Sequence, residues 1–151
     1  MPLPSFESYA RLVLGPANVP YSVEAEADNA EYQAGLARVG DQLWRVRTAK
    51  VTPTKPGAFV SVWRRAADGS TEPFPLDDPA DGLLVFVSKQ GRSGVFRFRR
   101  ELLGELGISR SSTRSGKRGF RVYPAWCTGL NPQATRTQRA QGPAFEELSL
   151  P

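Results

Sequence analysis

Arginines alternate with apolar residues, some of them aromatic, in the segment 44–65, WRVRTAKVTPTKPGAFVSVWRR, which is the densest chemical signal in the chain. Phosphate groups bind fixed cations on a stiff scaffold, and nucleic-acid bases stack on interleaved aromatic rings. A solvated face of a β-strand would carry the same pattern. Pro53 and Pro56 stiffen the turn around Lys55, however, and this rigidity favours a binding surface because a flexible loop would suffice for solubility.

A second basic segment, RSSTRSGKRGFRVYPAW, covers residues 110–126. A loop of this kind can fold around backbone phosphates, although a solubilising loop has the same composition. Across the two segments we predict phosphate contacts by Arg45, Arg47, Lys50, Lys55, Arg64, Lys117, Arg118 and Arg121. Bases would stack on Trp63, Tyr123 or Trp126, which are equally suited to a hydrophobic core.

Carboxylates form the third signal, and they allow a metal-dependent alternative. We predict a helix from Ser22 to about Gln33, on which Glu24, Asp28 and Glu31 share one face. Such a face could hold Mg²⁺, or it could carry acids that the helix dipole favours. In a nuclease, Glu31 with Asp41 or Asp81 would bind the metal and Lys50 would orient the attacking water. No cofactor is expected outside this alternative.

Composition excludes several other chemistries. The chain has no histidine, which removes the common catalytic triads and histidine-ligated zinc. Cys127 is the only cysteine, so no disulfide can form within the chain. There is no apolar run long enough to span a membrane and no basic segment typical of a signal peptide at the N-terminus. We therefore expect a cytoplasmic protein without a membrane partner.

The length of 151 residues suits one domain, and hydrophobic periodicity predicts its elements. Helices are expected over residues 5–14, 22–33, 101–107 and 133–141. Strands are expected over residues 34–39, 42–50, 59–65, 83–89, 95–100 and 120–126. This order predicts a mixed α/β domain over residues 1–151, with one central mixed sheet flanked by helices.

In these segments the chain resembles the MepB family of small bacterial proteins. The resemblance covers about residues 24–145 and depends on six stretches. They are AEYQAGLARVG, WRVRTAKVTPTKPGAFVSVWRR, TEPFPLDD, SGVFRFRRELL, GKRGFRVYPAW and QATRTQRAQ. The longest specific motifs are R-x-A-K-x-T-P-x-K-x-G-x-F-V from Arg47 and K-R-G-x-R-V-Y-P-x-W from Lys117 to Trp126.

The resemblance implies a core similar to the PD-(D/E)xK restriction endonucleases, in which a helix Glu, a strand Asp and an acid-x-Lys pair bind Mg²⁺. Here Thr48 stands where the acid of the acid-x-Lys pair would precede Lys50, and residues 59–65 contain no acid. The sequence therefore favours a nucleic-acid-binding protein on a nuclease-like scaffold that has lost its metal centre. The alternatives are a binder of a protein or small anionic ligand, and an active Mg²⁺-dependent nuclease.

Overall fold

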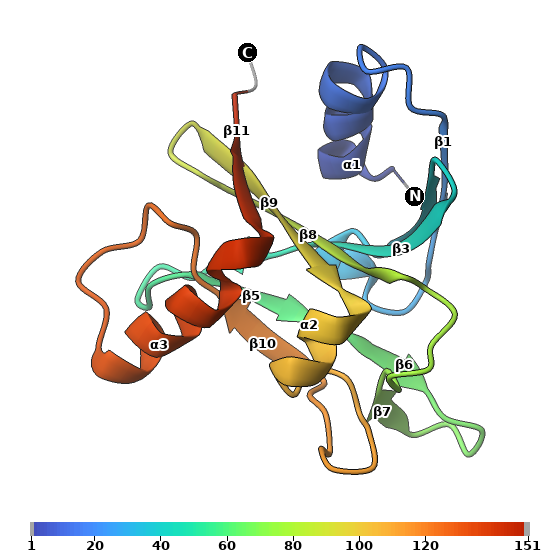
Figure 1. The fold of residues 1–151 in the computed structure, drawn as a ribbon, viewed down its shortest axis with the longest axis vertical. Coiled ribbons are helices and arrows are strands. Elements are labelled where there is room, and N and C mark those ends of the chain that lie inside the picture. Colours follow the sequence, from blue (N-terminus) through green and yellow to red (C-terminus); the bar gives the residue numbers. More distant parts are fainter. Residues whose placement is uncertain (1, 150–151) are drawn as a thin grey trace.

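A six-stranded mixed sheet forms the centre of the computed structural model, which describes residues 2–149 (Figure 1). Its strand order is β1-β2-β3-β8-β9-β11, and only the β3–β8 pair is parallel. The strands are β1 (Tyr21–Ala25), β2 (Gly35–Val39), β3 (Gln42–Thr48), β8 (Gly82–Lys89), β9 (Arg92–Arg99) and β11 (Phe145–Leu148). The prediction of a mixed α/β fold around a central sheet is confirmed.

The central strand β8 is buried on both faces, as its continuous apolar run predicts. Leu83, Val85 and Val87 point into one hydrophobic cluster. Leu84 and Phe86 point into the other, because successive side chains alternate across a strand. The sheet therefore separates two cores, and each needs its own cover.

The first core is covered by the N-terminal helix. The helix α1 (Pro4–Tyr9) continues as a π-helical segment, η1 (Ala10–Leu14). Phe6 and Tyr9 pack against Phe86, with ring centroids 6.4 and 5.3 Å from it. The helix predicted over residues 5–14 is thus present, with a change of pitch within it.

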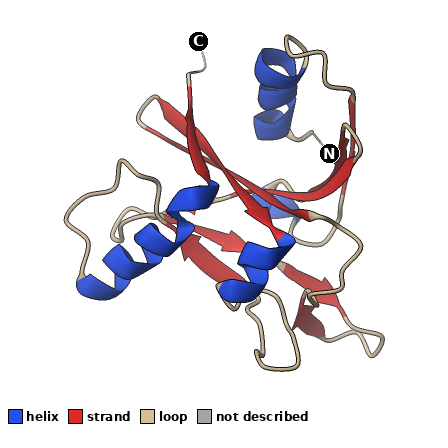
Figure 2. Ribbon diagram, viewed as in Figure 1, coloured by secondary structure: helices blue, strands red, loops and turns tan. Residues whose placement is uncertain are grey.

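A smaller sheet and one helix cover the second core, and a second helix packs against the smaller sheet (Figure 2). The sheet has the order β10 (Gly119–Val122), β5 (Ala58–Ser61) and β4 (Lys50–Val51). The helices are α2 (Arg100–Glu105) and α3 (Pro132–Gln141), and the 3₁₀ turn η3 (Gly142–Ala144) follows α3. Both helices were predicted, and the Asn131 side chain accepts a hydrogen bond from the Ala134 amide at 2.8 Å as the N-cap of α3.

The strand predicted over residues 59–65 is divided between two sheets. β5 pairs with β10, whereas β6 (Trp63–Arg65) pairs with β7 (Thr71–Pro73) in a separate two-stranded sheet. The chain changes partners at Val62, which is buried between the two strands. The strand predicted over residues 120–126 is also shorter than expected, and the C-terminal strand β11 was not predicted.

The helix predicted over residues 22–33 is wrong. This segment forms the edge strand β1, a connecting loop and the 3₁₀ turn η2 (Ala30–Tyr32). Antiparallel pairing with β2, from Tyr21↔Val39 to Ala25↔Gly35, satisfies the backbone of β1. Asn29 and Gln33 have positive φ angles of 62° and 51°, which end any helix there. The carboxylates predicted to share a helix face therefore do not.

Candidate functional site

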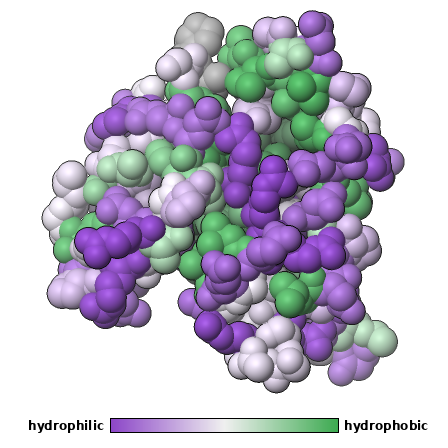
Figure 3. Space-filling view, in the orientation of Figure 1, coloured by the Kyte–Doolittle hydropathy of each residue, from purple (hydrophilic) through white to green (hydrophobic). Residues whose placement is uncertain are grey.

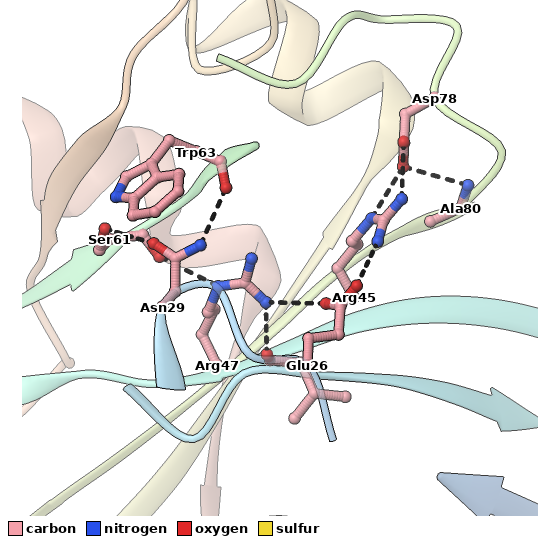
Figure 4. A network of polar contacts seen from close by, with 9 residues as sticks. Glu26, Asn29, Arg45, Arg47, Ser61, Trp63, Asp78 and Ala80 are labelled. Carbon is pink, nitrogen blue, oxygen red and sulfur yellow. Dashed lines mark hydrogen bonds and ion pairs between the residues drawn. The ribbon is translucent and has the colours of Figure 1, made fainter. Parts of the chain in front are cut away.

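The two arginines of β3 belong to a partly buried polar network rather than to a basic surface (Figure 4). Arg45 donates through Nε and Nη2 to the Asp78 carboxylate at 3.1 and 2.9 Å, and through Nη1 to Glu26 at 3.0 Å. Its guanidinium also lies over the Phe74 ring, 4.6 Å from the centroid. The charge of Arg45 is therefore matched by two carboxylates from other segments.

Arg47 is almost entirely buried, with 1% of its surface exposed. Its Nε donates to the Ser61 carbonyl at 3.0 Å, and Nη1 donates to the Val46 carbonyl at 2.8 Å. Burial lowers the pKa of the Arg47 guanidinium to about 10, although the nearby Glu26 carboxylate opposes this shift. The predicted phosphate contact of Arg47 needs correction, because a buried guanidinium has no surface that a phosphate can reach.

The network continues into the loop that follows β1. Asn29 accepts a hydrogen bond from the Ser61 hydroxyl at 2.6 Å and donates to the Trp63 carbonyl at 2.8 Å. Glu26 Oε1 is buried without a hydrogen-bond partner and lies 3.7 Å from Arg47 Nη1. These contacts join the β1–β2 connection to β5 and β6, so the network holds the sheets together.

The predicted catalytic residues lie at opposite ends of β3. Asp81 accepts a hydrogen bond from the Leu43 amide at 2.8 Å, and Asp41 lies in the β2–β3 turn. Glu31 instead pairs with Lys50 at 3.4 Å, beyond the other end of the strand. The seven residues of β3 span roughly 20 Å. Across residues 2–149, no three Cys, Asp or Glu side chains gather in a possible metal site.

A groove between β10 and α3 collects basic residues from the second basic segment and from α3. It has a volume of about 380 Å³. Its cations are Lys117, Arg121 and Arg136, and its other lining residues are Leu106, Ile108, Phe120, Tyr123, Gln133, Thr137, Ala140 and Gln141. Figure 3 shows a notch beside α3 with hydrophilic surface on both sides. None of the lining residues is acidic.

Gln141 fixes the geometry of this groove. Its side-chain amide donates to the Arg121 carbonyl at 2.8 Å and accepts from the Tyr123 amide at 2.9 Å. These bonds occupy the outer edge of β10, which would otherwise have unpaired backbone groups. Gln141 is itself buried, so the end of α3 is held firmly against β10.

The proline-stiffened turn also packs against this site. Arg121 Nη1 donates to the Pro56 carbonyl at 3.1 Å. Gly57 has a φ angle of 76°, and a Cβ atom there would lie 2.6 Å from the Val122 carbonyl oxygen. Lys50 and Arg121 are each the register partner of Phe59 across the small sheet. The two basic segments identified in the sequence therefore meet in space.

The remaining predicted residues have individual positions. Arg64 pairs with Glu72 at 2.9 Å, and Arg118 donates to the Thr71 carbonyl at 3.2 Å. Lys55 is exposed on the turn. Trp126 packs on Phe145, with ring centroids 5.6 Å apart.

Trp63 is the remaining stacking candidate, and it has the Arg65 guanidinium 5.0 Å from its ring. Of the three stacking candidates, only Tyr123 lines the groove.

Sequence reasoning missed Arg136, which contributes a third cation to the groove from α3. The signal was the composition of residues 132–141, which include Arg136 and Arg139 but no acid. A helix without acids presents unbalanced positive charge, but only the packing of α3 beside β10 directs Arg136 toward Lys117 and Arg121.

A more enclosed hollow than the groove lies elsewhere, between the Arg45 network and α2. Phe74, Leu103 and Ile108 are among its apolar walls, and Arg100 is one of its polar residues. Its volume is about 40 Å³, enough for a few water molecules but small for an organic ligand.

Comparisons with known proteins agree with the resemblance that the sequence motifs indicate. The sequence model described as MepB-like matches residues 26–147. A solved crystal structure of MepB is 34% identical and superposes with a TM-score of 0.85, covering 96% of this chain and 97% of its own. A comparison with curated proteins finds no significant match. None of the helices in residues 2–149 is long and apolar enough to cross a membrane. The chain belongs to the MepB-like family.

Proposed function

We propose that this protein binds nucleic acid by contacting backbone phosphates in the groove between β10 and α3. The observation that carries the proposal is the lining of the groove, which contains Lys117, Arg121 and Arg136 but no carboxylate. Phosphate contacts with Lys and Arg supply most of the non-specific affinity of nucleic-acid-binding proteins. Lys55, which is exposed on the turn, and Arg118, which follows Lys117, remain predicted contacts outside the lining of the groove.

The pairing of the cations supports the groove over the β3 arginines. Within residues 2–149, Lys117, Arg121 and Arg136 make no ion pair, whereas Arg45 and Arg64 do. A cation that is already paired must give up its partner before it binds phosphate. Lys50 is intermediate, because it is exposed but pairs with Glu31 at 3.4 Å.

The geometry favours binding over metal-dependent cleavage. Glu31, Asp41 and Asp81 do not line the groove, and a two-metal mechanism needs carboxylates that converge on the phosphate. We therefore propose a binding protein rather than a nuclease.

Fluorescence anisotropy with labelled DNA and RNA, at about 50 and about 200 mM salt, tests this proposal. We expect affinity to fall with salt, by about 0.7 to 0.9 log units per log unit of salt for each phosphate contacted. Gel analysis of the same mixtures with Mg²⁺ should show intact products. Mg²⁺-dependent cleavage would instead support the nuclease alternative.

Arg136→Ala tests the contribution of the groove most directly. It should lower the magnitude of the salt slope by about 0.7 to 0.9 and weaken binding about five- to eightfold at about 0.1 M salt. Alanine is a good helix former, so α3 should remain folded. Arg38→Ala, which removes an exposed cation on β2 outside the groove, should leave binding unchanged. No binding at low salt, or binding insensitive to salt, would favour a protein or small-anion ligand.

A further inference from the structure

Two further hollows share Lys89, Gln90 and Arg92 with each other, and their linings also contain no carboxylate. The turn hollow, about 260 Å³, is lined by Pro56, Gly57, Lys89, Gln90, Arg92, Trp126, Cys127 and Thr128. The hairpin hollow, about 360 Å³, is lined by Ser8, Arg11, Leu12, Ser88, Lys89, Gln90, Gly91, Arg92 and Ser93. Each therefore offers positive charge and polar donors to an anionic ligand.

The close approach of Gly57 to Tyr123 relates the groove to the turn hollow, and shared residues connect the turn hollow to the hairpin hollow. The Pro56–Gly57 turn separates the groove from the turn hollow, and Gly57 lies so close to the Tyr123 ring that a Cβ atom would be 2.8 Å from it. Lys89 and Arg92 line both the turn hollow and the hairpin hollow. The three hollows therefore follow one another from α3, past the turn, to the β8–β9 hairpin, and together they are called the track below.

We infer that the track binds a single strand of nucleic acid, with bases against Tyr123 and Trp126 and phosphates along the cations. This inference rests on the proposed function and names its substrate class. Proteins bind single strands in positively charged grooves with aromatic stacking surfaces, and here Tyr123 lines the groove while Trp126 lines the turn hollow.

The shape of the track favours a single strand over a duplex. Proteins read duplex DNA by placing a helix or a β-ribbon in its major groove, about 12 Å wide. Here the cations line hollows, and apolar and aromatic side chains lie beside them. Apolar and aromatic surface inside a hollow suits unstacked bases, which a duplex keeps within its own stack.

One acidic residue lies close to the track. Glu147 pairs with Arg92 through two hydrogen bonds of 2.8 and 2.9 Å. The Arg92 guanidinium also lies 5.2 Å from the centre of the Trp126 ring. Arg92 therefore positions the indole, while Lys89 and Arg11, which make no ion pair within residues 2–149, supply the positive charge.

Oligonucleotide length separates the track from the groove alone. Anisotropy is measured with single strands of about 4 and about 12 nucleotides and with a duplex of about 12 base pairs. The longer strand should bind more tightly than the shorter one and than the duplex. Lys89→Glu should weaken the longer strand at least about fivefold at about 0.1 M salt, the effect of one lost phosphate contact, and leave the shorter strand nearly unchanged.

Arg38→Glu is the matched control, because it reverses an exposed charge on β2 outside all three hollows. Stacking is tested with Tyr123→Phe, which should retain affinity, and Tyr123→Ala, which should lower it about tenfold. Circular dichroism checks that each variant is folded. The comparison of Lys89→Glu with Arg38→Glu does not depend on Tyr123→Ala. It therefore still tests the inference if Tyr123→Ala unfolds.

Two results would overturn the inference while leaving the proposed function intact. The duplex could bind as tightly as the longer strand, or Lys89→Glu could weaken the longer strand no more than Arg38→Glu does. Absence of binding to every oligonucleotide at about 50 mM salt would instead contradict the proposed function itself.

Discussion

At the scale of single residues, the surroundings of an arginine decide its role. Arg47 and Arg121 both lie on β-strands within basic segments. The Arg47 guanidinium is enclosed and bonds to backbone carbonyls, whereas Arg121 is only half-buried and lines the groove. The first therefore stabilises the fold, and the second is available for a ligand.

Arg47→Ala should lower the free energy of unfolding by about 3–5 kcal/mol, since it breaks a buried charge network and leaves the Ser61 carbonyl without its donor. Arg47→Lys should rescue little of this loss, because an ammonium group lacks the planar fork that reaches two carbonyls. Chemical denaturation measures both variants. Arg38→Ala, at an exposed site, should stay within about 0.5 kcal/mol of the original protein.

The opposite pattern would reverse the assignment of Arg47. If Arg47→Ala were as stable as Arg38→Ala and bound nucleic acid more weakly, then Arg47 would contact phosphate as the sequence predicts.

At the scale of elements, the TPTKPG turn and the strand β11 each determine part of the track. The turn separates two hollows and accepts a hydrogen bond from Arg121. β11 pairs with β9 and provides Glu147 to Arg92. Displacement of either element would move aromatic side chains that we propose as stacking surfaces.

Gly57→Ala should destabilise the protein by at least about 2 kcal/mol for two reasons. The new Cβ atom would lie 2.6 Å from the Val122 carbonyl oxygen, and alanine would have to adopt the positive φ angle of this position. Gly69→Ala is the matched control, since Gly69 also has a positive φ angle but nothing within 4 Å. It should cost only about 1 kcal/mol. Thermal or chemical unfolding measures the stability of both variants. Equal losses of stability in Gly57→Ala and Gly69→Ala would show that the turn does not pack on β10.

The attachment of β11 should depend on pH. The Arg92 guanidinium lowers the pKa of the Glu147 carboxyl below its ordinary value by hydrogen bonding. A carboxyl whose pKa is lowered in the folded state contributes stability above its unfolded pKa, and this is lost as pH falls through the folded pKa. Glu147→Gln should therefore make the decline in stability between about pH 5 and about pH 3 shallower.

Denaturation curves at several pH values measure this slope. Glu101→Gln is a suitable control, because Glu101 is exposed on α2 and makes no ion pair within residues 2–149. A slope unchanged by Glu147→Gln would mean that the Arg92 pair is absent in solution.

At the scale of the whole molecule, positive charge is divided between two environments. Carboxylates from other segments pair with Arg45 and Arg64. The cations around α3, the turn and the β8–β9 hairpin line hollows without acids. The net charge of the whole chain, +5, is therefore unevenly distributed over its surface. The attraction of an anionic ligand should be strongest at the track.

Much of the fold could be predicted from local patterns. Alternation and apolar runs identified β2, β3, β8 and β9, and the Asn131-Pro132 start and Gly142-Pro143 end identified α3. The segment 22–33 failed because its backbone bonds are made with β2 and not within the segment. The likeness to the restriction-endonuclease core stays a prediction.

The sequence by itself determined the family, the central mixed sheet and the absence of histidine chemistry, because these depend on motifs, periodicity and composition. Only the tertiary structure decided which cations are buried or paired and which are accessible. Arg47 and Arg136 are separated by most of the chain, and the residues next to each of them in the sequence do not show whether its side chain is exposed. Burial and pairing are set by segments distant in sequence, so the groove could be recognised only after the sheets and α3 had packed together.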